Sequence, residues 1–209
     1  MIAVTSTITT VVFDLGNVLI GWDPHRVWSR TLSDVEIERF LSESGFEGLN
    51  RSLDAGRSYA DARAELQARA PHHVATLDAY WEDFAGALTG PVPGTEQLVS
   101  ELAGLGMRLL GLTNWSAETV HLAPDAAPAV RVLEDLLVSG REGLLKPDPA
   151  IFELLLDRYR LAPERTVFVD DVQANVDGAR SVGLHAYLFT GVAQLRADLR
   201  SLGIGVAPS

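Results

Sequence analysis

The chain has 209 residues, a formal net charge of −11 and 47% hydrophobic residues. This length suits one core domain with a modest insertion, and the apolar fraction is enough to fill a core. A nucleic-acid binder needs positive charge to neutralise phosphates, so we expect no nucleic-acid partner. The absence of cysteine excludes disulfides, thiolate metal sites and a cysteine nucleophile.

No apolar run approaches the roughly 20 residues that are needed to cross a bilayer, so we expect no membrane partner. The first ten residues, MIAVTSTITT, lack the basic region and the long apolar segment of a signal peptide. These features predict a cytoplasmic protein. Nothing in the sequence indicates an oligomeric state.

Short apolar runs alternate with helical patterns along the chain, which is typical of a parallel sheet with helices on both faces. Five runs are nearly continuous in apolarity, as buried parallel strands are. These expected strands are Thr10–Phe13, Met107–Leu112, Leu136–Val138, Thr166–Val169 and Ala186–Phe189. The order predicts an α/β fold class with a Rossmann-like sheet.

Residues 20–91 separate the first strand from the next α/β unit, and their pattern is helical. Ser33-Asp34-Val35-Glu36 is a capping box, and Ser58 is a second N-cap. The expected helices run from Ser33 to about Ser44, from Ser58 to about Ala70, and over Val74–Leu88. We predict an all-helical cap domain at residues 20–91, inserted in a core domain of residues 1–19 and 92–209, with hinges near Leu19–Gly21 and Pro91–Gly94.

The rest of the core sequence supplies further helices. Pro149 suits the first turn of one of them, with Asp148 as its cap. The expected helices cover residues 95–105, a segment from Ser116, Pro149 to about Arg160, Gln173–Gly183 and Val192–Leu202.

Polar side chains follow three of the predicted strands. Asp14 comes directly after the first strand, Thr113 after Leu112, and Asp170 and Asp171 after Val169. Taken singly, each is most simply a turn former or a helix cap. In an open parallel sheet, however, ligands bind beyond the carboxyl ends of the strands, so these groups should meet at one edge.

This combination favours phosphate chemistry. Adjacent acids are costly without a cation, and three carboxylates suit Mg²⁺, which binds together with phosphate. The Thr113 hydroxyl and the backbone N–H of Asn114 can hold phosphate oxygens. Lys146, alone an ordinary surface lysine, can balance the charge of a nucleophilic carboxylate. Asp14 can then form an aspartyl-phosphate.

The chain resembles the haloacid dehalogenase-like hydrolase superfamily, subfamily I, with a helical type-1 cap. Four segments match the motifs of that family in order: VVFDLGNVL (11–19), LLGLTN (109–114), LLKPDPAIF (144–152) and TVFVDDVQANVDGARSVG (166–183). FDLGNVL followed by WDP is similar to a branch that contains sugar-phosphate phosphatases. The resemblance covers nearly the whole chain.

The resemblance implies a role for each matching residue. Asp14 matches the nucleophile, Thr113 and the Asn114 main chain the phosphate-binding groups, and Lys146 the lysine that steadies both. The implied metal ligands are Asp14, the backbone carbonyl of Gly16, Asp171 directly, and Asp170 directly or through water. Asn175 matches a residue that braces this last motif.

The sequence departs from the family pattern at Gly16. In the family's phosphatases an aspartate at this position protonates the leaving oxygen and later activates water. General acid–base help of this kind is worth about 10²–10⁴ in rate. Asp23 and His25 are candidates to replace it, although Asp23 can equally cap a helix that begins at Pro24.

We therefore expect a Mg²⁺-dependent phosphatase acting on a small phosphorylated metabolite, with sugar phosphates as the first class to test. The alternatives are a 2-haloacid dehalogenase, which gains nothing from the acidic pair at 170–171, and a non-catalytic degenerate member. Trp115 is expected to bind substrate at the pocket mouth. The other aromatic candidates are Trp22, Tyr59, Trp28 and Trp81, and the last two, in helical patterns, are better explained as packing residues.

Overall fold

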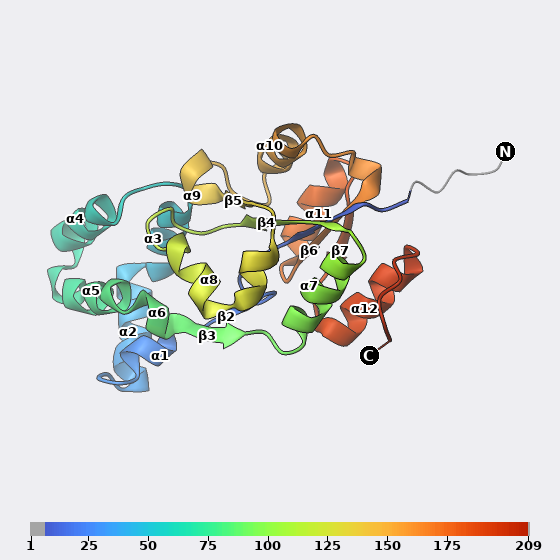
Figure 1. The fold of residues 1–209 in the computed structure, drawn as a ribbon. Coiled ribbons are helices and arrows are strands. Elements are labelled where there is room, and N and C mark those ends of the chain that lie inside the picture. The colour runs from blue at the N-terminus through green and yellow to red at the C-terminus, as the bar shows by residue number, and fades with distance from the viewer. Residues whose placement is uncertain (1–6, 209) are drawn as a thin grey trace.

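The computed structural model describes residues 7–208, so residues 1–6 and 209 of the predicted core domain lie outside it. Its centre is a five-stranded sheet in which all neighbouring strands are parallel (Figure 1). In spatial order the strands are β5 (Leu136–Val138), β4 (Arg108–Thr113), β1 (Thr10–Phe13), β6 (Thr166–Asp170) and β7 (His185–Leu188). The five predicted strands are confirmed, with ends shifted by one residue in β4, β6 and β7.

Helices cover both faces of this sheet, because successive side chains of a strand point to opposite faces. Val12 of β1 packs in one cluster with Ile151 and Phe152, whereas Val11 and Phe13 pack in another with Leu98 and other residues. The main helices are α10 (Pro149–Tyr159) and α11 (Gln173–Ser181) on the first face, and α7 (Thr95–Gly104) and α12 (Val192–Ser201) on the second. This arrangement confirms the predicted α/β fold class.

The insert between β1 and α7 is a group of helices that lies to one side of the sheet in Figure 1. The capping box at Ser33 is present, and Ser58 caps its helix through the backbone N–H of Asp61, both as predicted. The helices are α1 (His25–Trp28), α2 (Asp34–Ser44), α3 (Phe46–Asp54), α4 (Tyr59–Arg69), the 3₁₀ helix η1 (Pro71–His73), α5 (Val74–Glu82) and α6 (Phe84–Ala87). We refer to residues 20–91 as the helical insert.

The insert differs from the all-helical prediction in three ways. The helix expected over Val74–Leu88 ends at Glu82, and Leu88 begins a strand. That strand, β3 (Leu88–Pro91), pairs antiparallel with β2 (Ile20–Trp22). The segments by which the chain enters and leaves the insert therefore form a small two-stranded ribbon. Helix α3 was not predicted, although its buried residues Phe46, Leu49 and Leu53 follow helical spacing.

The prediction of a helix from Ser116 is also wrong. The chain there forms only short turns, because Pro124 and Pro128 remove backbone donors that a longer helix needs. The turns are η2 (Val120–Leu122), α8 (Ala123–Ala126) and η3 (Pro128–Val132), and two more short helices are α9 (Ser139–Glu142) and η4 (Pro163–Arg165). Among the described residues, no helix combines the length and apolarity that a membrane crossing requires.

Candidate active site

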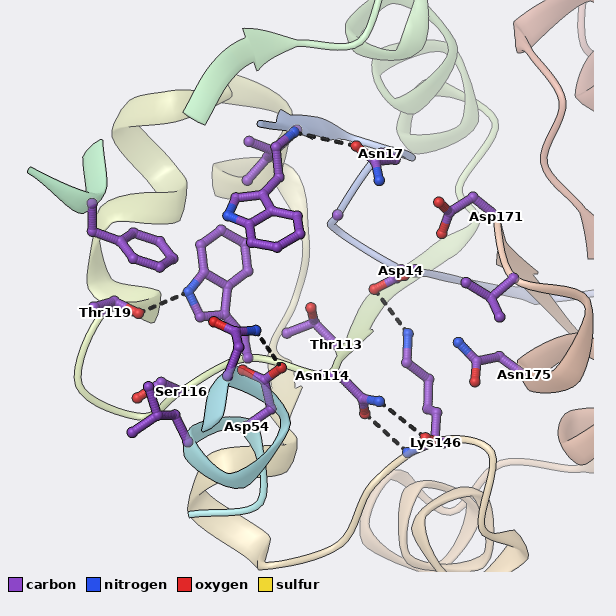
Figure 2. Close-up of a pocket in the computed structure, with 18 of the residues that line it drawn as sticks. Asp14, Asn17, Asp54, Thr113, Asn114, Ser116, Thr119, Lys146, Asp171 and Asn175 are labelled. Atoms are coloured by element: carbon purple, nitrogen blue, oxygen red, sulfur yellow. Dashed lines mark hydrogen bonds and ion pairs between the residues drawn. The ribbon is translucent and has the colours of Figure 1, made fainter. Parts of the chain in front are cut away.

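Three strands deliver polar groups to the same edge of the sheet. Residues Phe13, Gly111 and Val169 stand at the same level in neighbouring strands, so Asp14 and Asp170 follow at the same height. Thr113 ends β4 and lines the same pocket as Asp14. The prediction that these groups meet at the carboxyl edge is therefore confirmed, and Figure 2 shows Asp14, Thr113 and Asp171 around the pocket at this edge.

Lys146 joins two of the carboxylates through its buried ammonium group. Nζ lies 2.8 Å from Oδ1 of Asp14 and 2.7 Å from Oδ2 of Asp170, and it donates to the carbonyl oxygen of Leu112 at 3.1 Å. These contacts use all three donors of the ammonium group. The side chain is only 1% exposed, so its charge is fixed in place by its partners.

The pKa values of this group follow from burial and charge. Burial raises the pKa of Asp14 to about 7, Lys146 opposes the shift, and Asp170 adds to it. Burial alone lowers the pKa of Lys146, but the attraction of Asp14 and Asp170 outweighs it and raises that pKa. The two carboxylates therefore favour the charged form of Lys146.

Asn114 holds the loop that carries Lys146. Its amide Nδ2 donates to the carbonyl of Lys146 at 3.0 Å, and its Oδ1 accepts from the backbone N–H of Lys146 at 2.9 Å. These two hydrogen bonds connect the end of β4 to the loop that carries Lys146, which we call the lysine loop. The sequence indicated a role only for the Asn114 main chain, and the side chain adds this positioning role.

The three acids form a compact group that could hold a cation. One carboxylate oxygen each from Asp14, Asp170 and Asp171 lies within 4.8 Å of the others. Asn175 donates to both oxygens of Asp170, at 2.9 and 3.1 Å, and the backbone N–H of Val172 donates at 2.8 Å. The bracing contact expected for Asn175 is thus present, and it is made to Asp170.

The Asp171 side chain is less buried than that of Asp170. Its side chain is partly exposed and lines the pocket beside Gly16 and Asn17. Burial raises the pKa of Asp171, and the charge of Asp170 adds to the rise. Both burial and the neighbouring negative charge disfavour the Asp171 carboxylate, and a cation at this position would stabilise it.

A cavity of about 230 Å³ opens above these groups. Its floor is polar, whereas aromatic side chains from the insert and from the turn after β4 form much of the remaining wall. These aromatic residues are Trp22, Tyr80, Trp81, Phe84 and Trp115. Trp115 lines the cavity, as expected, and its Nε1 donates to Oγ1 of Thr119 at 3.0 Å.

The other aromatic expectations divide between pocket and packing. Trp28 is 1% exposed and contacts Phe40 and Phe46, so it belongs to the core of the insert. Trp81 was assigned to packing, but it lines the cavity and stacks on Tyr59 with ring centroids 4.4 Å apart. The correction arises because Trp81, near the C-terminal end of α5, faces the cavity, which the helical pattern of its sequence does not show.

Asp23 and His25 do not line the cavity. Oδ1 of Asp23 accepts from the backbone N–H of His25 at 3.0 Å, a contact that fixes the start of α1. His25 is exposed. The helix-capping explanation of Asp23 is therefore the one that the structure supports.

One lining carboxyl was missed by the sequence reasoning: Asp54, the last residue of α3. Burial raises its pKa to about 7, opposed by a hydrogen bond from the Ser116 backbone and by Lys146 and Arg51. Its segment, SLDAG, looks like an ordinary helix end. Only the docking of α3 on the core turns this side chain toward the pocket.

Comparison with known proteins defines the class of this protein. The family model of haloacid dehalogenase-like hydrolases matches residues 8–183. Fold, site and this match agree, and the chain belongs to that family of hydrolases.

Relatives of known name support the same class. Acyl-CoA dehydrogenase family member 10 of Mus musculus is 36% identical over 84% of this chain, which spans only 17% of that protein. A sesquiterpene phosphatase of Aspergillus oryzae, astK, is 24% identical over 94% of this chain and 97% of its own length. The solved structure of a predicted HAD-like family hydrolase from Porphyromonas gingivalis superposes with a TM-score of 0.73 at 26% identity, covering 94% of this chain and 98% of that one. Phosphatases are therefore among its relatives.

Proposed function

We propose that this hydrolase is a phosphatase that cleaves a small phosphorylated metabolite through an aspartyl-phosphate on Asp14. The observation that carries the proposal is the buried contact of 2.8 Å between Nζ of Lys146 and Oδ1 of Asp14 at the pocket floor. A lysine in this place lowers the repulsion between a carboxylate nucleophile and a phosphoryl group. Catalysis would be mostly positioning and electrostatics, as in other phosphoryl transfers.

Each residue at the floor takes one role in this proposal. Asp14 attacks phosphorus in line with the leaving oxygen, while Lys146 stays paired with it. The Thr113 hydroxyl and the Asn114 backbone N–H hold phosphoryl oxygens. Water then cleaves the acyl-phosphate and restores the Asp14 carboxylate.

The donor set fits Mg²⁺, which takes hard oxygen ligands. Because Lys146, Asn175 and Val172 already engage Asp170, we infer that Asp171 ligates directly and Asp170 directly or through water. Asp14 and the carbonyl of Gly16 would complete the protein ligands. Bound there, Mg²⁺ would neutralise charge on the phosphoryl oxygens and orient them.

The cavity guides the choice of substrates. Its volume of about 230 Å³ suits a small leaving group, and its aromatic walls suit a ring or an apolar chain. Sugar phosphates come first in the panel, and terpenyl phosphates second because of the name of astK. We also propose that residues 20–91 act as a cap domain over a core of residues 1–19 and 92–209.

The test is a panel of phosphate esters assayed with Mg²⁺, with EDTA, and with Asp14→Asn. We expect turnover that needs Mg²⁺ and that disappears in Asp14→Asn, whereas the surface variant Asp198→Asn keeps it. Release of halide from 2-haloacids that resists EDTA would instead identify a dehalogenase. A folded, Mg²⁺-supplied protein that turns over no member of the panel would favour the non-catalytic alternative.

A further inference from the structure

Breaking a phosphate ester leaves an oxygen that needs a proton, and the residue after Leu15 cannot supply one. Gly16 has no side chain, and a Cβ built on it would meet nothing within 4 Å. The lining carboxyls are Asp14, Asp171 and Asp54. The first two belong to the cluster of three acids, so among residues 7–208 Asp54 is the lining carboxyl outside that cluster.

Asp54 is held against the core by groups from several elements. Its backbone carbonyl accepts from Oγ of Ser139 at 2.6 Å, and its carboxyl faces the backbone N–H of Ser116. Nδ2 of Asn50 lies 3.3 Å from its Oδ2. A hydrogen bond from a core side chain to the main chain of Asp54 therefore fixes where the end of α3 lies.

The approach of the insert to the core is close at this point. A Cβ on Gly56 would lie 3.0 Å from the carbonyl oxygen of Gly140, and the φ of +95° at Gly56 also favours glycine. Figure 2 shows Asp54 and Asp14 on different sides of the pocket, with Thr113 between them in that view. An in-line reaction places nucleophile and leaving group on opposite sides of phosphorus, so this arrangement puts Asp54 on the leaving-group side.

We propose that Asp54 is the general acid and base of this site, supplied by the helical insert in place of a side chain at Gly16. The inference rests on the phosphatase function proposed above. It adds a catalytic residue from α3, a helix that contributes none of the floor groups.

Charged groups around Asp54 are consistent with both protonation states. Lys146 and Arg51 favour the carboxylate, burial favours the acid, and the balance raises the pKa to about 7. Tyr80 of α5 also faces it, and the charge of Asp54 contributes to the raised pKa of that phenol. A group that titrates near neutral pH can both give and take a proton.

The proton balance closes over two steps. In the first, Asp14 forms a bond to phosphorus, the ester P–O bond breaks with its electron pair on oxygen, and protonated Asp54 gives that oxygen its proton. In the second, the Asp54 carboxylate takes a proton from water as the water oxygen bonds to phosphorus. The P–O bond to Asp14 then breaks, and Asp14 and Asp54 return to their starting states.

The test compares two aryl esters in Asp54→Asn, wild type and the control Glu47→Gln, an exposed acid on the same helix. Asparagine keeps an oxygen that can accept from Ser116. 4-Nitrophenolate leaves without protonation, whereas phenolate, from an acid with a pKa of about 10, needs it. Single-turnover rates should therefore fall in Asp54→Asn by about 10²–10⁴ for phenyl phosphate and little for 4-nitrophenyl phosphate.

A second readout follows the phosphorylated protein during turnover of 4-nitrophenyl phosphate. In Asp54→Asn, an initial burst of 4-nitrophenolate should precede slow turnover, and phosphorylated protein should accumulate. The reason is that the attack of water on the aspartyl-phosphate lacks its base. Equal losses on both esters, or unchanged rates on both, would overturn the role of Asp54. Failure of the proposed function would look different, since wild type would cleave neither ester or Asp14→Asn would remain active.

Discussion

Lys146 and Asp14 meet at 2.8 Å in a site where the lysine side chain is 1% exposed and the aspartate side chain 11%. Neither charge is solvated in the usual way, so the Lys146 cation depends on Asp14 and Asp170, and the Asp14 carboxylate depends on Lys146. This dependence links the stability of the core to the chemistry that we propose for it. Substitutions here should therefore change both.

Lys146→Met should remove the cation and leave two buried carboxylates without their partner. Breaking a buried ion pair from one side typically costs about 3–5 kcal/mol, so urea unfolding should shift to clearly lower concentration. Phosphatase activity should fall by about 10²–10³ or more, as when a preorganised transition-state donor is lost. Arg131→Met removes an exposed ion pair to Asp125 and should leave both measurements nearly unchanged. A stable, active Lys146→Met protein would contradict the assignment.

Asn175→Ala should weaken the metal site without touching the nucleophile. The change removes both hydrogen bonds to Asp170 and leaves that carboxylate free to turn. Loss of such supporting contacts typically costs about 10–100-fold in metal affinity, so half-maximal activity should need that much more Mg²⁺. The measurement is a Mg²⁺ titration of activity, with the exposed Gln173→Ala on the same helix as control. An unchanged midpoint would show that Asp170 needs no bracing.

Asp54→Asn should change how stability depends on pH. The folded pKa of Asp54 is raised from 3.8 to about 7, so the folded state binds its proton more tightly than the unfolded state does. Its contribution to stability is therefore fully present below the unfolded pKa and is lost as pH rises toward about 7. Relative to Asp54→Asn, the wild type should lose up to a few kcal/mol between about pH 4 and pH 8.

Urea unfolding of both proteins across this range measures the difference, and common groups such as Asp14 cancel in it. Glu47→Gln provides the matched control, because that exposed carboxyl is not held by the core. A difference between wild type and Asp54→Asn that stays constant with pH would show that burial does not perturb this carboxyl.

Gly178→Ala should disturb the lysine loop through packing alone. A Cβ at this position would meet the carbonyl oxygen of Pro147 at 2.4 Å and Cε2 of Phe152 at 3.0 Å. Because Pro147 follows Lys146, relief of this clash must move the loop, and we expect lower activity and a loss of about 1–3 kcal/mol of stability. Gly48→Ala in α3 meets nothing within 4 Å and should instead gain about 0.5–1 kcal/mol. Full activity in Gly178→Ala would mean that the loop tolerates displacement.

The sequence alone was enough to locate the sheet and its polar edge. Buried parallel strands are local signals, since a few consecutive apolar residues define each of them. Once the strands are parallel, their ends must meet, so Asp14, Thr113 and Asp170 could be placed together before any coordinates were known. The capping box at Ser33 and the Asp148 cap were readable for the same reason, because each involves neighbours in the chain.

Only the tertiary structure decided what the helical insert contributes. The ribbon of β2 and β3 pairs residues such as Ile20 and Pro91, and no local pattern records such a distant pairing. The same holds for Trp81 and Asp54, which look like packing and surface residues in their own helices. Their place at the pocket depends on how α3 packs on the core and on how α5 packs within the insert, and contacts summed over the whole insert set that geometry.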